Sequence, residues 1–281
     1  MSNHPQNTAQ PKYHFISGLP RSGSTLLSAL LKQNPRFHAD MTSALGSLIS
    51  ANIQIMSPGS ETALLIKEDQ RPLILKGLIH SYYSSNNSEV IFDTNRSWCA
   101  KLPLLDELCN GSKVIACVRN MSWIMDSLER VVHKNPYQNT RLFSADMSRS
   151  TVYARVEAFA QQNSLVGFPY AALKEAFYGE YADNLLIVEY EFLARTPEKV
   201  LPLIYEFIGE PWFDSHDYTN VQYDAPEFDA ALGASGLHKV RPKVSFEPRN
   251  TILPPDLFNK FKDMDFWRDV TGSKAHVITA K

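Results

Sequence analysis

Short runs of hydrophobic residues alternate along the chain with longer segments in which hydrophobic side chains recur at helical spacing. The short runs are typical of buried strands, because they are almost wholly apolar and each ends at a polar residue or a glycine. They are Tyr13–Ser17, Val90–Phe92, Lys113–Val118 and Asn184–Glu189. Strands that alternate with helices indicate an α/β fold, with a parallel sheet and helices on both of its faces. Ligands of such sheets bind beyond the carboxyl ends of the strands.

The helical segments lie between these strands, and helix-stopping pairs such as Asn34-Pro35 mark their ends. Residues 148–181 are mostly helical with an interruption near residues 167–169, and residues 211–255 are rich in loops and prolines. The predicted helices are Thr25–Leu31, Thr42–Met56, Arg71–Tyr83, Lys101–Cys109, Trp123–His133, Thr196–Ile208 and Pro255–Trp267.

The composition changes this picture little. Of 281 residues, 44% are hydrophobic and 21% are charged, which is typical of a soluble globular protein. We expect a disordered polar tail over residues 1–11 and a single domain over residues 12–281. The net charge of −2 argues against binding to nucleic acid. No apolar run of about 18 residues and no signal sequence occur, so we expect no membrane span and a cytoplasmic location.

Three cysteines, Cys99, Cys109 and Cys117, form no CxxC pair. Their odd and sparse distribution is typical of a protein from a reducing compartment. A zinc site would need histidines at ligand spacing, and His133 is too isolated to supply one. The sequence therefore predicts no disulfide and no bound metal.

The strongest chemical signal lies between the first strand and the first helix. Gly18 and Gly23 have the separation of the glycines in a Walker A phosphate loop, and Thr25 has the place of its Ser/Thr. Ser24 stands where the lysine would be, and the cation is Arg21 instead, which argues against an ordinary ATPase or nucleotide kinase. The segment offers an anion its amides, hydroxyls and one cation, from Gly18, Pro20, Arg21, Ser22, Gly23, Ser24 and Thr25.

The segment from Gly18 to Leu27 resembles the 5′-phosphosulfate loop of sulfotransferases, and its arginine is most similar to the loop of tyrosylprotein sulfotransferases and their bacterial relatives. The resemblance implies a P-loop-type central parallel sheet. It also implies the co-substrate 3′-phosphoadenosine 5′-phosphosulfate (PAPS), whose sulfuryl group passes in line to a hydroxyl or amine. Arg21 would then stabilise charge on the leaving phosphate and the sulfuryl oxygens.

Two later segments extend the resemblance. The family has an arginine at the end of a buried strand and a serine eight residues later, matched here by Arg119 and Ser127. The resemblance implies that both bind the 3′-phosphate of PAPS, although a lone arginine is by default a surface ion pair. The family usually has Asp-Pro or Asp-Gly after this arginine, where this chain has Asn120-Met121. Tyr190, in a segment similar to the Tyr-Glu-Asp-Leu strand end of the family, would lie near the adenine or serve as a half-buried structural residue.

The last basic segment, residues 235–243, packs three cations and a glycine into a loop. Sulfotransferases have a late basic loop that closes over the 3′-phosphate, so Lys239 and Arg241 are candidates for this role. The alternative is a solvated basic loop.

The general base stays open at this point. Tyrosylprotein sulfotransferases use a glutamate a little beyond the first helix, and here the count reaches Thr42, with Asp40 and His38 just upstream. Cytosolic sulfotransferases use a histidine after a middle strand, which here ends in Asp93. Asp93 and Asp40 are equal candidates for the base, with His38 behind them, and Arg96 is a candidate for a second cation in the transition state.

Two rival functions remain at the level of sequence. Val90–Asp93 also resembles a Walker B strand, whose aspartate would hold Mg²⁺ in an atypical ATP-dependent kinase. A catalytically inactive nucleotide-binding module is the other alternative. If the chain is a sulfotransferase, its acceptor is a peptide tyrosine or a small molecule, and the sequence does not distinguish them.

Overall fold

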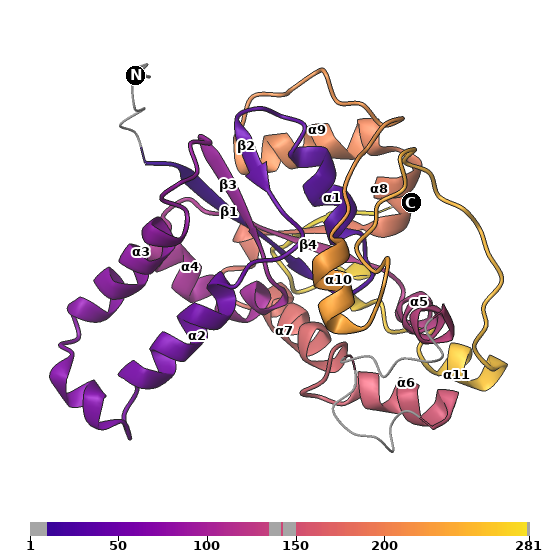
Figure 1. Ribbon diagram of the computed structural model, residues 1–281, viewed down its shortest axis with the longest axis horizontal. Helices are drawn as coiled ribbons and strands as arrows, with labels where there is room; N and C mark the ends of the chain where they lie inside the picture. The colour runs from indigo at the N-terminus through magenta and orange to yellow at the C-terminus, as the bar shows by residue number, and fades with distance from the viewer. Residues whose placement is uncertain (1–9, 135–141, 143–149, 280–281) are drawn as a thin grey trace.

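The computed structural model describes residues 10–134, 142 and 150–279. Within them, six strands form one sheet in the order β2-β3-β1-β4-β5-β6, and every pairing is parallel (Figure 1). The strands are β1 (Lys12–Gly18), β2 (Phe37–Ala39), β3 (Val90–Thr94), β4 (Val114–Val118), β5 (Leu185–Glu189) and β6 (His276–Ile278). The predicted parallel sheet with helices on its two faces is therefore confirmed.

Side chains from alternate strand positions enter two separate hydrophobic cores. In β4, Val114, Ala116 and Val118 belong to one core, while Ile115 and Cys117 belong to the other. Because both faces are buried, the strands have continuous apolar sequences instead of alternating ones. The first core contains side chains of α4 (Leu102–Leu108), α5 (Met121–Lys134), α6 (Val152–Ala160) and α7 (Gly167–Tyr178), and the second those of α1 (Ser24–Leu31), α8 (Tyr190–Arg195) and α9 (Pro197–Ile208).

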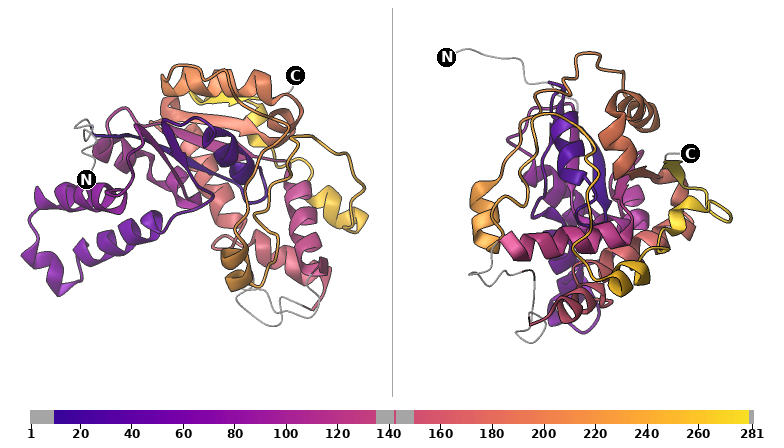
Figure 2. Two further views of the ribbon diagram at one scale, coloured as in Figure 1. Left: turned by 45° about the horizontal axis from the view of Figure 1, so that its top comes forward. Right: turned by 90° about the vertical axis from the view of Figure 1, so that its right-hand side faces the viewer.

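Two further regions project from this framework. The helices α2 (Leu45–Met56) and α3 (Gln70–Tyr82), joined through the 3-10 turn Glu61–Leu65, form an arm that extends away from the sheet (Figures 1 and 2). Between α10 (Pro226–Leu232) and α11 (Pro255–Lys260) the chain has no helix or strand. We call residues 235–249 of this connection the strap. Figure 2 shows it running past α5.

Most predicted elements are present, and the differences are local. The second helix begins at Leu45 instead of Thr42, because the backbone N–H of Ser43 donates to the Thr94 carbonyl and ties this segment to β3. The helical break precedes Gly167, which starts α7. The last helix ends at Lys260, and a separate 3-10 turn covers Phe266–Arg268. The strands β2 and β6 were not predicted, since three residues carry too little pattern.

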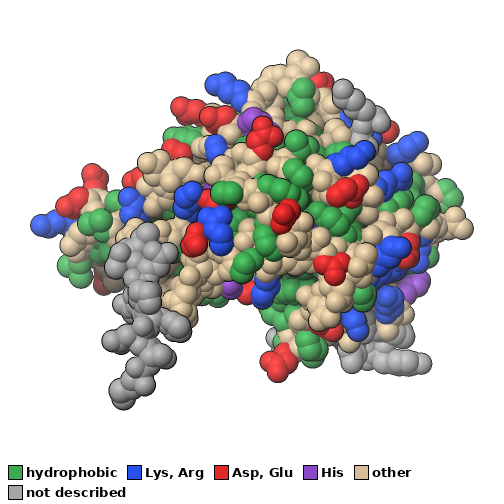
Figure 3. Space-filling model, turned by 90° about the horizontal axis from the view of Figure 1, so that it is seen from above, with side chains coloured by type: hydrophobic (Ala, Val, Ile, Leu, Met, Phe, Trp, Pro, Cys, Tyr) green, Lys and Arg blue, Asp and Glu red, His purple; other side chains and the backbone are tan. Residues whose placement is uncertain are grey.

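The predicted disordered tail lies outside the described residues, except for residues 10 and 11. No helix in the described ranges is long and apolar enough to cross a membrane. Acidic and basic side chains are interspersed over the face shown in Figure 3.

Candidate functional site

The loop after β1 depends on Gly18. This residue has a φ of 102°, and a Cβ there would lie 2.1 Å from the carbonyl oxygen of Cys117 in β4. Only glycine allows the chain to turn this close to a neighbouring strand. The N–H of Leu19 donates to the same carbonyl at 2.9 Å. The loop is therefore fixed to the sheet at its first residue.

Ser22 fixes the middle of the loop to the neighbouring strand β4. Its side chain is fully buried and its hydroxyl donates to the Cys117 carbonyl at 2.8 Å. Ser22 therefore holds the loop in shape, and neither it nor Pro20 is among the residues that line the adjoining cavity. Gly23 precedes α1 with a φ of 93°, and a Cβ there would meet the Tyr190 ring at 2.8 Å. Gly23, Ser24 and Thr25 do line the cavity, at the positive end of the helix dipole.

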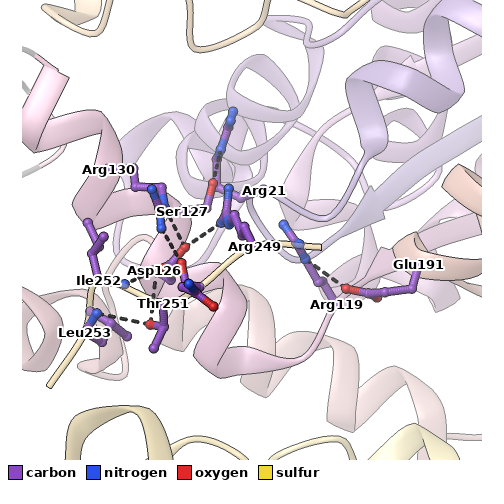
Figure 4. A network of polar contacts seen from close by, with 11 residues as sticks. Arg21, Arg119, Asp126, Ser127, Arg130, Glu191, Arg249, Thr251, Ile252 and Leu253 are labelled. Carbon is purple, nitrogen blue, oxygen red and sulfur yellow. Dashed lines mark hydrogen bonds and ion pairs between the residues drawn. The ribbon is translucent and has the colours of Figure 1, made fainter. Parts of the chain in front are cut away.

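Arg21 has the one positive φ, 59°, found among the described residues other than glycine. Its Nε donates to the Ser127 hydroxyl at 3.1 Å (Figure 4). Its Nη1 donates to the Leu237 carbonyl. Burial, together with the charges of Arg119 and Arg96, lowers the pKa of Arg21 to about 10. The side chain therefore stays charged at neutral pH, in a place where other cations repel it.

Arg119 follows β4 at its carboxyl end. Its guanidinium lies 4.4 Å from the centre of the Tyr190 ring, and its Nε donates to Glu191 at 3.0 Å. The ring and the carboxylate both come from the start of α8, so the neighbouring strand end fixes the direction of this arginine. The structure thus places Tyr190 against Arg119 as well as at the cavity wall.

Ser127 lies in α5, beside an ion-pair network centred on Asp126 (Figure 4). The buried Asp126 carboxylate accepts from Arg130 at 2.9 Å and pairs with Arg249 of the strap at 2.6 Å. Burial alone would raise the pKa of Asp126, but the hydrogen bonds from Arg130 and from the N–H of Ile252 outweigh it and lower the pKa. The network attaches the end of the strap to α5.

Lys239 and Arg241 lie on the rim of the same cavity. Lys239 is 3.9 Å from Asp224, and Arg241 pairs with Glu247. Their side chains are 68% and 69% exposed, so these pairs are solvated. The strap thus carries cations whose charge is partly balanced by carboxylates.

Arg21, Arg119, Ser127, Tyr190, Lys239 and Arg241 all lie around one cavity of about 480 Å³ at the carboxyl edge of the sheet. Its described lining contains a single carboxylate, that of Glu247. Nine cationic side chains line it: Arg21, Arg96, Arg119, Arg130, Lys134, Lys239, Arg241, Lys243 and Arg249. Such an excess of positive charge in a concave site is suited to a ligand with several negative charges.

Asp93 lies outside this cavity. Its carboxylate is 1% exposed and accepts hydrogen bonds from Tyr83 at 2.6 Å and from the Trp98 indole at 2.8 Å. Burial raises the pKa of this carboxyl, although these hydrogen bonds act in the opposite direction. The geometry is that of a structural anchor between β3, α3 and the turn at Trp98. Arg96, three residues later, does line the cavity and has no carboxylate partner among the described residues.

The other two candidates for the base also lie elsewhere. Asp40 forms an ion pair with Lys32 at 2.7 Å and lies 3.5 Å from the His38 ring. Asp40 lines a separate, open hollow beside Tyr223. Burial lowers the pKa of His38, whose ring packs on the edge of Tyr83. Neither residue is part of the cationic cavity.

The sequence analysis did not single out several residues that line the cavity, among them Arg130, Lys134, His238, Phe246 and Arg249. The basic character of the segment was visible, but its partners were not, because Asp126 is separated from Arg249 by more than a hundred residues. In the described ranges, no group of three His, Cys, Asp or Glu side chains is placed to hold a metal ion.

The parallel sheet, and a glycine-rich anion loop between its first strand and first helix, define a P-loop-type α/β protein. Residues 14–214 match the model of a sulfotransferase family. The chain belongs to that family and is a sulfotransferase. Among curated protein sequences, none matches the chain.

Several solved structures are similar to the chain at low sequence identity. The sulfotransferase domain from the curacin biosynthetic pathway is 16% identical over 92% of each chain, with a TM-score of 0.50. A sulfotransferase from Alicyclobacillus acidocaldarius is 15% identical over 90% of each chain, with a TM-score of 0.48. The sulfotransferase domain of the Synechococcus PCC 7002 olefin synthase is 18% identical over 95% of this chain and 99% of that one, with a TM-score of 0.45.

Proposed function

We propose that the cationic cavity binds PAPS between two anion sites and transfers its sulfuryl group to a hydroxyl or amine acceptor. The 5′-phosphosulfate lies on the loop, at Arg21, Ser24 and Thr25. The 3′-phosphate lies at Arg119 and Ser127. PAPS is the donor implied by the family, and the match to residues 14–214 includes all of these positions.

The observation that carries this proposal is that both predicted anion sites line one cavity. Arg21 and Ser127 come from segments 106 residues apart, yet their side chains are hydrogen-bonded. A single nucleotide with phosphates at both ends of its ribose can therefore contact both sites. Ser127 accepts this hydrogen bond with its oxygen and keeps its own O–H to donate to a phosphate, so both side chains can hold the donor without separating.

In this arrangement Arg21 supplies most of the electrostatic stabilisation. It is half-buried among other cations, and none of the described carboxylates pairs with it. Charge that builds up on the bridging oxygen and on the sulfuryl oxygens would relieve the repulsion between these cations. Arg96 lines the same cavity and is the second cation in our proposal.

Tyr190 has a position that supports two roles. Its ring packs against both the Arg119 guanidinium and Gly23, so it aligns the two anion sites with each other. It also lines the cavity, which supports the predicted contact with adenine. We propose that the first role is the larger one, because the Arg119 guanidinium lies directly over the ring, 4.4 Å from its centre.

The acceptor is proposed only as a class. The arginine in the loop resembles that of tyrosylprotein sulfotransferases and favours a hydroxyl such as that of a peptide tyrosine, while a small-molecule alcohol remains the alternative. The ATP-dependent kinase has less support, since Asp93, which would hold its Mg²⁺, is enclosed by Tyr83 and Trp98.

Calorimetric titration tests the donor site. The wild-type protein is titrated with 3′-phosphoadenosine 5′-phosphate (PAP), with AMP, and with ATP plus Mg²⁺. The titrations with PAP and AMP are carried out both with and without EDTA. We expect tight, EDTA-insensitive binding of PAP and much weaker binding of AMP, which lacks the 3′-phosphate. Preference for ATP with Mg²⁺, or equal affinities for PAP and AMP, would contradict the proposal.

A further inference from the structure

His238 lies in the strap beside the cations proposed to hold the sulfuryl group. It lines the same cavity as Arg21 and Arg96. The preceding residue, Leu237, accepts a hydrogen bond from Arg21 through its carbonyl. This contact fixes the backbone next to His238 against the phosphosulfate loop.

A buried carboxylate holds the ring of His238 from the other side. Nδ1 of His238 lies 2.5 Å from Oδ1 of Asp229, and the His238 backbone N–H donates to Oδ2 of Asp229 at 3.0 Å. Asp229 belongs to α10 and is fully buried, and the edge of the Phe228 ring packs against the imidazole at 5.5 Å. Since a carboxylate only accepts hydrogen bonds, Nδ1 carries the proton and Nε2 keeps its lone pair.

The geometry points to His238, oriented by Asp229, as the base that takes the proton of the acceptor during sulfuryl transfer. This inference rests on the proposed donor site. It differs from the positions implied by the family resemblance, because His238 follows neither the first helix nor the middle strand. Asp229 is a positioning residue in this scheme and does not touch the acceptor.

Other residues along the described cavity wall are less suited to the task. Glu247 is the one carboxylate there, and it is 61% exposed and paired with Arg241. The lysines and arginines are cations and accept no proton. His238 combines a neutral nitrogen, a place beside Arg21 and Arg96, and a fixed orientation.

The charges around His238 favour a neutral imidazole. Burial lowers its pKa; Asp229 raises it, and the charges of Arg21 and Arg96 lower it further, with a net decrease. The ring is therefore mostly unprotonated at neutral pH and ready to accept a proton.

The transfer step then balances as follows. The O–H bond of the acceptor breaks and its proton goes to Nε2 of His238. The acceptor oxygen uses the freed electron pair to bond to sulfur. The bond from sulfur to the bridging oxygen breaks, and its electron pair stays on the 5′-phosphate of the departing PAP. The imidazolium afterwards releases the proton to solvent.

The first experiment is a pH titration of His238 by NMR, in full-length protein labelled with ¹³Cε1-histidine. The signal that is absent in His238→Gln identifies the residue. PAP brings negative charge to Arg21 and Arg96, so their repulsion of the imidazolium weakens. We expect PAP to move the His238 titration to higher pH by roughly one pH unit. The His276→Gln variant, changed in the edge strand β6, is the control and should show the same PAP-induced shift.

The second experiment uses water as the acceptor and measures release of labelled sulfate from PAPS. We expect His238→Gln to slow this hydrolysis by about 10²- to 10⁴-fold with little change in PAP affinity. The wild-type rate should rise with pH through the titration of His238. Asp229→Asn removes the charge that favours the imidazolium, so its profile should shift to lower pH.

The outcomes separate this inference from the donor site. Failure of the wild-type protein to bind PAP would overturn the proposed function itself. Normal PAP binding without any shift of the His238 titration would overturn only the base. So would hydrolysis at the wild-type rate by His238→Gln.

Discussion

The two walls of the cationic cavity are built in different ways. One wall consists of the loop after β1 with the first turn of α1, Arg119 after β4, and Ser127 and Arg130 of α5. The other wall is the strap, which has neither helix nor strand. Backbone hydrogen bonds from Val240 and Val244 to the Tyr223 and Tyr218 carbonyls hold it, together with the polar contacts to Arg21 and Asp126. The geometry of the first wall is set by the sheet, and that of the second wall is set by separate contacts with neighbouring segments.

The two walls also differ in whether their cationic side chains are paired with carboxylates. Arg21 and Arg96, on the sheet side, have no carboxylate partner among the described residues, whereas Lys239 and Arg241, on the strap, pair with Asp224 and Glu247. Cations held by a rigid framework without counterions are ready for an anion and need little rearrangement. Paired cations in solvent must first leave their partners, so they contribute less per charge. This contrast predicts that substitutions in the sheet wall reduce turnover or donor affinity more than substitutions in the strap do.

Arg21→Ala should have the largest effect. It removes the cation closest to the proposed leaving group, and we expect kcat to fall by about 10²- to 10³-fold. The affinity for PAP should fall much less, because Arg119 and the loop amides remain. Turnover is measured as PAP released at saturating PAPS, and affinity by calorimetry. Arg21→Lys keeps the charge and should recover part of the rate.

A loss of PAP affinity with unchanged kcat in Arg21→Ala would contradict this prediction. Arg21 would then be a binding residue, and the sheet wall would serve only to hold the donor.

Arg119→Ala should come second and should act mainly on binding. A charge-assisted hydrogen bond contributes about 1.5–3 kcal/mol, so the affinity for PAP should fall by that amount. AMP, which lacks the 3′-phosphate, should be bound as in the wild type. Arg36→Ala, which removes an arginine paired with Glu89 and Glu210 away from the cavity, is the matched control. If the variant lost the same amount of affinity for PAP and for AMP, Arg119 would not be the residue that binds the 3′-phosphate.

The sheet wall is also the part that the sequence could predict. Four of the six strands, β1, β3, β4 and β5, were visible as apolar runs, and the loop from Gly18 to Thr25 carried its own chemistry in consecutive residues. Arg119 and Ser127 were eight residues apart, on a strand end and the helix that follows it. Each of these signals is local, so no knowledge of distant contacts was needed.

The strap and the base depended on contacts that no local pattern contains. Asp93 stands at the carboxyl end of β3, where the topology favours a functional residue. Its carboxylate is nevertheless hydrogen-bonded by Tyr83 and Trp98. These contacts form only through tertiary packing. His238 stood in the segment that drew attention for its lysines and arginines. Its candidacy as the base depends on Asp229 of α10, which forms hydrogen bonds with both the ring and the backbone of His238.

Arg241→Ala should have the smallest effect and is the most direct test of the contrast between the walls. Its side chain is 69% exposed and already paired with Glu247, so the donor would gain only a solvated ion pair from it. We expect the affinity for PAP to fall by no more than about fivefold, and this small loss should disappear at high salt. Calorimetry at low and high ionic strength, beside Arg119→Ala, measures both. A loss as large as that of Arg119→Ala would mean that the strap closes over the 3′-phosphate when the donor binds, and that its ion pairs exchange partners.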